Sequence, residues 1–350
     1  MTIFRPHITQ MKAYSPPLEG RDPHQHLLLD FNERTLPVSD RIKQALIRYI
    51  QDDRLQMYPS YGQLTNKIAN YCGVNESQVM LTNGSDQGID LIIRAACTEG
   101  DEAIIPTPTF AMYHQCAKVE NLSIIEPVYS RASGFPKQGV MEAISDRTRL
   151  IVLANPNNPC GTLIPRADIL AIAKAAPQAA ILVDECYFEY SQETLADAVN
   201  DYPNILITRT FSKTWGLPSI RLGYVISHSD NIKALLNVRG PYDINQFAAV
   251  AIDAALDYPE ESLSYVREVM DQAKPLLEAW LDRKNIVYWP SAANFVWLFP
   301  ENPKQAEQHL RELGILVRPK MDAKGQTGLR VTIGNLPQTK RLIETLDQVL

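Results

Sequence analysis

The sequence contains little of what marks proteins built around disulfides or metal ions. Its 350 residues include five cysteines, which are odd in number, scattered along the chain and never arranged as Cys-x-x-Cys. The six histidines form no His-Glu-x-x-His or His-x-x-x-His pattern. Because zinc sites and disulfide frameworks need such spacings, we expect reduced thiols and no metal site.

Long apolar runs and basic blocks are also missing. No window approaches the roughly 18 uninterrupted apolar residues of a membrane-spanning helix, and the first residues lack the apolar core of a signal peptide. The formal net charge is -6 at pH 7, and no stripe of basic and aromatic residues is present. These absences argue against a membrane or a nucleic acid as partner, and we expect a cytoplasmic protein.

What the sequence does contain is an alternation of short apolar runs with helical patterns. Runs this short suit strands buried on both faces, and their alternation with helices is typical of a parallel sheet covered by helices. We therefore predict an α/β fold with a mostly parallel central sheet. The expected strands lie at residues 79–81, 103–105, 122–125, 150–153, 180–183, 205–207 and 224–226.

The chain after residue 245 has a different pattern, which predicts a smaller α+β domain. Its expected helices lie at residues 246–282, 304–313 and 338–350, and its expected strands at 294–299 and 329–333. A chain of this length is long enough for two domains. We predict an N-terminal arm that packs on the small domain or on a partner subunit, a large domain and a small domain, over residues 1–35, 36–245 and 246–350.

A glycine and two polar residues follow the first strand and open a helix. Gly84 permits a tight turn, and Ser85 or Asp86 can cap the helix. The free N–H groups at such a helix start would hold a phosphate. An ordinary strand-to-helix turn explains this segment equally well when it is considered alone.

An aromatic residue and an asparagine-rich loop follow two further strands. Phe110 can lie flat on a planar ring, although an aromatic residue in this place is more often part of the core. The loop Asn155-Pro156-Asn157-Asn158-Pro159-Cys160-Gly161 combines a fixed backbone with side-chain amides. It carries more polar groups than a turn requires.

Charged residues follow the strands at 180–183 and 205–207. Burying the Asp184 carboxylate is costly unless a cation pairs with it. That cation can be a basic side chain in a structural ion pair or a protonated pyridine nitrogen. Asp184 can also cap a helix. Tyr187 lies three residues further on. Ser212 and Lys213 precede Arg221 by nine and eight residues. Desolvation and a cationic neighbour would lower the pKa of the Lys213 amine and allow a Schiff base, whereas a surface lysine is the simpler interpretation of this segment alone.

In chain order these segments are the glycine turn, the aromatic residue, the asparagine loop, Asp184 with Tyr187, and Ser212-Lys213 with Arg221. Together they supply a phosphate site, a stacking ring, an acid for a ring nitrogen, hydrogen-bond donors and an amine. Pyridoxal 5'-phosphate (PLP) requires these groups, and ligands of such sheets bind where the strands end. Through the Asn-Pro-Asn-Asn-Pro-x-Gly loop, the Val-Asp-Glu-x-Tyr strand end and the Ser-Lys pair with its arginine, the sequence resembles the fold-type I PLP-dependent aminotransferases. The resemblance covers nearly the whole chain and is greatest to the histidinol-phosphate aminotransferases.

The resemblance implies a role for each residue around the cofactor. Lys213 would form the Schiff base and move a proton at the substrate α-carbon. Asp184 would pair with the ring nitrogen. Tyr187 and Asn158 would bond the ring's phenolic oxygen, and Phe110 would stack on the ring. The residues implied for the cofactor phosphate are Gly84, Ser85, Asp86, Ser212 and Arg221, with Tyr58 reaching it across a dimer interface.

The same resemblance implies a homodimer with shared active sites. Arg330 would bind the anionic end of the substrate, a phosphate in this subfamily, with Arg318 and Tyr14 beside it. Asn32 lies in a segment that would line the substrate entrance, where Arg34 departs from the Asn-Glu-Asn-Pro pattern common in the family. The implied reaction is L-histidinol phosphate plus 2-oxoglutarate to imidazole-acetol phosphate plus L-glutamate, in histidine biosynthesis.

Three other activities would use many of the same residues. An aromatic amino-acid aminotransferase would bind a carboxylate with Arg330. A threonine-phosphate decarboxylase would remove carbon dioxide from the substrate instead of a proton. A non-catalytic sensor that binds PLP carries a DNA-binding domain, for which we expect no room in this chain.

Overall fold

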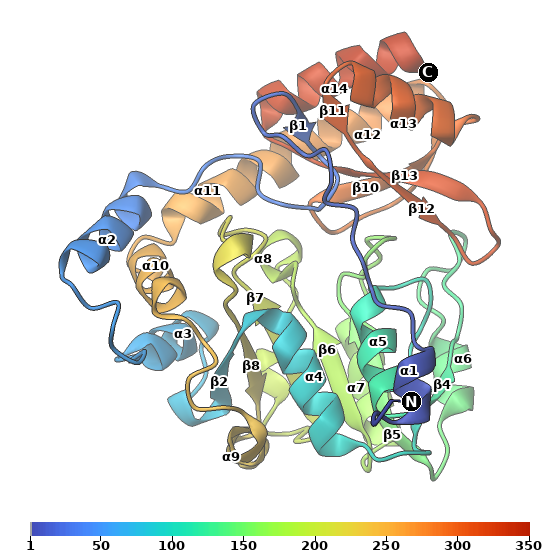
Figure 1. Ribbon diagram of the computed structural model, residues 1–350. Coiled ribbons are helices and arrows are strands. Elements are labelled where there is room, and N and C mark those ends of the chain that lie inside the picture. The colour runs from blue at the N-terminus through green and yellow to red at the C-terminus, as the bar shows by residue number, and fades with distance from the viewer. Residues whose placement is uncertain (1) are drawn as a thin grey trace.

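The computed structural model describes residues 2–350, and a seven-stranded sheet lies at the centre of its larger part (Figure 1). The strand order is β2-β8-β7-β6-β5-β3-β4. Neighbouring strands from β7 to β4 are parallel, whereas β8 runs antiparallel to both β2 and β7. Each predicted apolar run forms one strand: β2 Val79–Thr82, β3 Glu102–Ile104, β4 Ser123–Ile125, β5 Thr148–Ala154, β6 Ala180–Asp184, β7 Ile205–Thr210 and β8 Gly223–Ser227.

Helices bury both faces of this sheet. Along β5, Ile151 and Leu153 belong to the hydrophobic cluster on one face, and Leu150 and Val152 belong to the cluster on the other. Such alternation between two cores confirms the predicted α/β fold with a mostly parallel sheet. One face is covered by α4 Gly84–Ala96, α5 Ala111–Val119 and α9 Ser229–Val238, and the other by α2 Asp40–Gln51, α3 Leu64–Cys72, α6 Lys137–Ala143, α7 Arg166–Ala175 and α10 Gln246–Leu256.

A smaller antiparallel sheet follows, in the order β12-β13-β10-β9. Helices pack on one of its faces around a separate core that includes Leu298 and Leu329. The other face is turned toward the large sheet, as the contact of Arg330 with Asn158 shows. The elements are α12 Lys274–Arg283, β9 Val287–Trp289, β10 Phe295–Phe299, α13 Pro303–Glu312, β11 Ile315–Leu316, β12 Arg318–Met321, β13 Thr327–Thr332 and α14 Leu336–Val349.

The helical stretch expected over residues 246–282 is in fact divided. Helix α10 ends before Pro259, α11 spans Glu260–Glu268, and a π-helical turn at Val269–Ala273 leads into α12. Pro259 and Pro275 have no N–H to donate, so neither can sit inside one regular helix. Since α10 packs in the core of the large sheet, we propose that the small unit begins after α10 and not at residue 246.

The N-terminal arm crosses from the large sheet to the small one. Helix α1 (Pro6–Gln10) lies beside α5, where His7 Nε2 is 3.1 Å from the Val119 carbonyl oxygen. Strand β1 (Leu27–Leu28) then pairs in parallel with β11. The residues that follow β1 therefore run between the two sheets.

Residues 2–350 include no helix that is both long and apolar enough to cross a bilayer. In the same part of the chain, no three His, Cys, Asp or Glu side chains are grouped so that they could hold a metal ion.

Candidate active site

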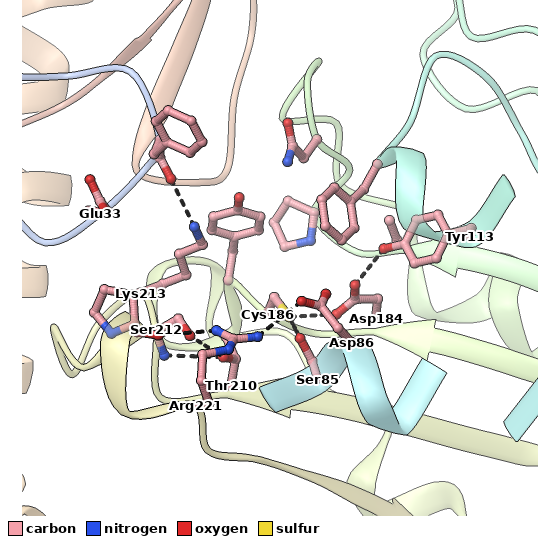
Figure 2. Close-up of a pocket in the computed structure, with 17 residues that line it drawn as sticks. Glu33, Ser85, Asp86, Tyr113, Asp184, Cys186, Thr210, Ser212, Lys213 and Arg221 are labelled. Carbon is pink, nitrogen blue, oxygen red and sulfur yellow. Dashed lines mark hydrogen bonds and ion pairs between the residues drawn. The ribbon is translucent and has the colours of Figure 1, made fainter. Parts of the chain in front are cut away.

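A pocket of about 770 Å³ opens where β5, β6 and β7 end (Figure 2). Its lining brings together residues from segments that are more than 100 positions apart in the chain. The predicted site residues that line it are Ser85, Asp86, Phe110, Asn158, Asp184, Tyr187, Ser212, Lys213 and Arg221.

Asp184 lies at the end of β6, and its carboxylate is 6% exposed. Burial raises the pKa of Asp184, and hydrogen bonds from Cys186 and Tyr113 partly oppose that rise. In the described part of the chain no side-chain cation pairs with this carboxylate. A buried acid with only neutral donors around it is suited to a cationic group of a ligand.

Lys213 follows β7, and its amine is held by a backbone oxygen. Nζ donates to the carbonyl oxygen of Phe31 at 2.8 Å. A dashed line marks this contact at Lys213 in Figure 2. Burial lowers the pKa of Lys213 to about 8, with a further contribution from Arg330. Near neutral pH this amine is therefore unprotonated far more often than an ordinary lysine, and the unprotonated form is the nucleophile.

The start of α4 forms the anion-binding end of the pocket. Gly84 has φ +71°, and a Cβ there would lie 2.4 Å from Arg221 Nη2, so this turn requires glycine. Arg221 Nη2 is 3.0 Å from Asp86 Oδ2, and the hydroxyl groups of Ser85 and Ser212 belong to the lining. Free N–H groups at a helix start, hydroxyls and a guanidinium together are suited to a phosphate.

Two predicted substrate residues connect the small sheet and the arm to this pocket. Arg330 on β13 donates to Asn158 Oδ1 and to the carbonyl oxygen of Asp30, both at 2.6 Å. Asn32 is 1% exposed and does not line the pocket; its Nδ2 donates to the Tyr187 hydroxyl at 2.9 Å. We infer that Asn32 acts by holding Tyr187 in place.

The remaining predicted residues lie outside the pocket lining. Tyr58 is 76% exposed, and its ring stacks on Tyr242 with the centroids 4.4 Å apart. The Arg318 guanidinium lies 5.2 Å from the ring centroid of Phe31, which itself lines the pocket. Tyr14 is exposed on the arm. Of these three, Arg318 contacts a lining residue, and Tyr14 lies close enough to Arg330 to influence its pKa.

Several residues of the pocket were not predicted from the sequence. Tyr113 donates to Asp184, and it lies three positions after Phe110, one turn along the start of α5. That spacing could have identified it, since residues three apart share a helix face. Phe31 takes part through its carbonyl oxygen, which leaves no side-chain signal. Cys186 and Thr210 also line the pocket.

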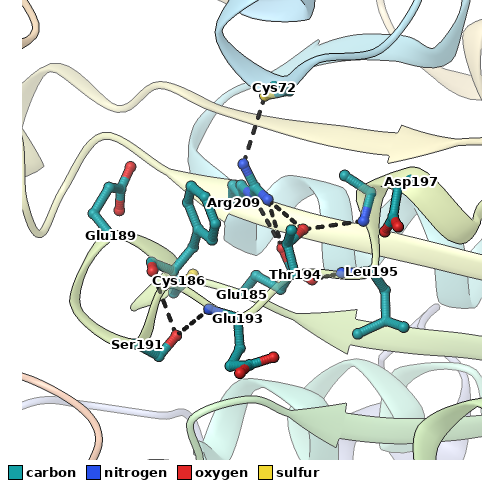
Figure 3. A network of polar contacts seen from close by, with 12 residues as sticks. Cys72, Glu185, Cys186, Glu189, Ser191, Glu193, Thr194, Leu195, Asp197 and Arg209 are labelled. Carbon is teal, nitrogen blue, oxygen red and sulfur yellow. Dashed lines mark hydrogen bonds and ion pairs between the residues drawn. The ribbon is translucent and has the colours of Figure 1, made fainter. Parts of the chain in front are cut away.

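A buried ion pair joins β7 to the segment that follows β6 (Figure 3). Arg209 on β7 donates to Glu185 Oε2 through Nε at 2.9 Å and Nη2 at 2.8 Å. The Thr194 hydroxyl and the Leu195 N–H donate to the same carboxylate at 2.9 Å and 2.7 Å. Because Glu185 directly follows Asp184, this network fixes the backbone from which Asp184 projects.

These features fit PLP. Asp184 offers a buried negative charge to a ring nitrogen, Phe110 offers a ring face, and Lys213 offers an amine of lowered pKa. The cradle around Gly84 and Arg221 offers an anion site at the other end. The residues present match the cofactor's charged ends and its aromatic ring.

The family model of class I and II aminotransferases matches residues 25–346. The chain belongs to this family. Since the family uses PLP and the pocket fits it, the chain is a PLP-dependent aminotransferase.

Relatives and solved structures match over the full length. The chain is 33% identical over 358 residues to a histidinol-phosphate aminotransferase of Desulfitobacterium hafniense (strain DSM 10664 / DCB-2), covering 99% of this chain and 97% of that protein. It is 32% identical over 366 residues to histidinol-phosphate aminotransferase 2 of Hydrogenovibrio crunogenus, with 99% and 95% covered. The structure of histidinol-phosphate aminotransferase from Sinorhizobium meliloti in complex with PLP superimposes with a TM-score of 0.89 at 20% identity, covering 100% and 98% of the two chains, and shows the shared fold.

The Glu185–Arg209 pair yields a stability prediction. Replacing Arg209 by Leu leaves a buried carboxylate without its cation, so we expect the free energy of unfolding to fall by about 3 to 5 kcal/mol. The control is Arg267→Leu, which breaks the exposed Arg267–Glu260 pair and should cost less than about 1 kcal/mol. Urea denaturation measures both variants. If both variants lost the same free energy of unfolding, burial would not make the Glu185–Arg209 pair more important for stability than the exposed pair.

The Tyr113–Asp184 contact yields a prediction on pH dependence. The Tyr113 hydroxyl favours the ionised form of Asp184, so Tyr113→Phe raises the pKa of Asp184 further. We expect the acid limb of kcat/KM to move to higher pH, and kcat at neutral pH to fall by roughly three- to tenfold. Tyr129→Phe removes a buried hydroxyl outside the pocket and serves as the control. An unchanged acid limb in Tyr113→Phe would contradict this role.

Proposed function

We propose that the protein transfers the amino group of L-histidinol phosphate to 2-oxoglutarate, giving imidazole-acetol phosphate and L-glutamate in histidine biosynthesis. The full-length relatives that carry this name support the substrate. The observation in this chain that carries the proposal is Arg330, a residue only 5% exposed whose guanidinium bonds only neutral oxygen atoms in the described residues. A cation buried in that way is suited to the anionic end of a substrate.

Seven polar residues of the pocket have a defined task in this reaction. PLP, when bound, supplies an aldehyde that condenses with amines and a ring that withdraws electrons from the substrate α-carbon. Asp184 holds the ring nitrogen protonated, and Tyr187 and Asn158 donate to the ring's phenolic oxygen. Lys213 Nζ carries the cofactor at rest and moves the proton at the substrate α-carbon. Ser85, Ser212 and Arg221 hold the phosphate.

Both substrates have an anionic end that Arg330 can bind in turn. A guanidinium forms paired hydrogen bonds with a phosphate and with a carboxylate, because both present two oxygen atoms at matching spacing. Asn158 and the Asp30 carbonyl hold Arg330 at the pocket edge in the meantime. One arginine can therefore serve histidinol phosphate in one half-reaction and 2-oxoglutarate in the other.

The proposal includes a cytoplasmic homodimer with shared active sites. Support comes from exposed apolar side chains, since an apolar patch of this kind is typical of an interface. They lie on and after α2, with Tyr242 near them, and include Ile47, Ile50, Leu55, Met57, Tyr58 and Tyr242. In the dimer Tyr58 reaches the phosphate of the partner's cofactor, which agrees with its position outside the pocket of its own chain. The five free thiols are in keeping with a reducing compartment.

Replacing Lys213 tests the reaction class. Lys213→Ala removes the amine that moves the proton and holds the cofactor, so we expect turnover to fall by at least about 10⁴-fold and the covalent cofactor link to disappear. Steady-state assays and mass spectrometry after borohydride reduction measure the two effects. The control is Lys324→Ala, which changes an exposed lysine. Retained transamination in Lys213→Ala would refute the assignment.

A titration with single amino donors tests the substrate. The holoenzyme receives histidinol phosphate, phenylalanine or threonine phosphate without a keto acid, and the absorbance of the bound cofactor is followed. We expect conversion at the lowest concentration with histidinol phosphate, because its phosphate meets Arg330. Preference for phenylalanine would instead indicate an aromatic aminotransferase, and carbon dioxide released from threonine phosphate would indicate a decarboxylase.

A further inference from the structure

Three cationic side chains lie on one face of the small sheet, the face turned toward the pocket. In the antiparallel pair of β12 and β13, Arg318 lies opposite Arg330 and Lys320 lies opposite Gly328. Residues opposite each other across strands point to the same side, as do residues two apart along one strand. Arg318, Lys320 and Arg330 therefore share one face, and Gly328 places no side chain among them.

Within residues 2–350 no acid forms an ion pair with these three cations; Asp30 lies close enough to raise the pKa of Arg330, but its carboxylate is paired with Arg21. Arg330 bonds an amide oxygen and a carbonyl oxygen, and its Nε is buried without a hydrogen-bond partner. Neither Arg318 nor Lys320 forms an ion pair in that part of the chain. Arg21, which packs on the same Phe31 ring as Arg318, is by contrast paired with Asp30 and Glu33.

Lys320 is not an ordinary solvated lysine. Its side chain is half-buried, whereas Met321 beside it and Lys324 in the same hairpin are exposed. Burial lowers the pKa of Lys320 to about 8, and the positive charges of Arg330 and Arg318 lower it further. The lysine thus lies close enough to both arginines to be repelled by them, and an anion bound between them would relieve that repulsion.

The two substrates of the proposed reaction make different demands on such a cluster. A carboxylate carries one charge on two oxygen atoms, which one arginine satisfies. A phosphate monoester carries a charge of about -1.5 to -2 at neutral pH and three acceptor oxygen atoms. A third cation therefore adds little to the binding of a carboxylate and much to the binding of a phosphate.

We propose that Lys320 is a specificity-determining residue, which completes with Arg318 and Arg330 a three-cation site for a phosphate dianion and contributes little to carboxylate binding. This inference rests on the proposed function for the identity of the phosphorylated amino donor. The placement of the three cations is independent of it.

The test compares a phosphate with a carboxylate on the PLP-saturated holoenzyme. The glutamate half-reaction, followed by cofactor absorbance, is inhibited with inorganic phosphate or with acetate. In Lys320→Met we expect the inhibition constant of phosphate to rise about tenfold, as for the loss of one charge-assisted hydrogen bond, while acetate and glutamate change less than about twofold. The half-saturating concentration of histidinol phosphate should rise by a similar factor.

Two further variants separate charge from structure. Lys320→Arg keeps the positive charge and should restore phosphate inhibition to within about threefold of the wild type. Lys324→Met removes a lysine from the same hairpin and should leave the inhibition constants of both phosphate and acetate unchanged. Far-ultraviolet circular dichroism and cofactor absorbance confirm that each variant is folded and loaded.

The outcomes distinguish the inference from the proposed function. Unchanged phosphate inhibition in Lys320→Met, or equal weakening of phosphate and acetate, would overturn the role of Lys320. If the wild type does not react with histidinol phosphate, the proposed function fails, but the comparison of inorganic phosphate with acetate still decides whether Lys320 selects a dianion.

Discussion

The pocket depends on burying Asp184 and Lys213 in one cavity while keeping them from neutralising each other. They follow neighbouring strands, β6 and β7, and both line the same space. A direct ion pair would hold the lysine charged and raise its pKa, which would remove the nucleophile. Instead, Tyr113 and the Cys186 N–H bond the carboxylate, and the Phe31 carbonyl oxygen takes the amine.

That separation explains why two distant segments flank the two residues. Helix α5 supplies Tyr113 on the side of Asp184, and the arm supplies Phe31 on the side of Lys213. Beneath them the Glu185–Arg209 pair satisfies a second buried carboxylate, one position along from Asp184. Two adjacent acids at one strand end are therefore treated differently. Glu185 is neutralised by Arg209 of the protein, whereas Asp184 is left to pair with a cationic group of a ligand.

The sequence predicts the part of the site that lies at strand ends. Seven apolar runs mark the sheet, and Asp184 stands out because a charge directly after a buried strand needs an explanation. Lys213 gained its role only from the other segments that precede it in the chain. The roles of Arg330 and Tyr58 came from the family resemblance and not from any local pattern. Tyr113 was missed because a tyrosine in a helix is usually core, and the packing of α10 on the large sheet was missed because periodicity does not say which core a helix joins.

Consecutive backbone oxygen atoms of the arm hold two cations of the site. The Asp30 carbonyl accepts from Arg330 of the small sheet, and the Phe31 carbonyl accepts from Lys213 of the large sheet. Every amino acid carries the same carbonyl group, so these two contacts by themselves constrain the path of the chain and not the residue type at positions 30 and 31. Here two essential charges are positioned by atoms that no comparison of residue types could reveal.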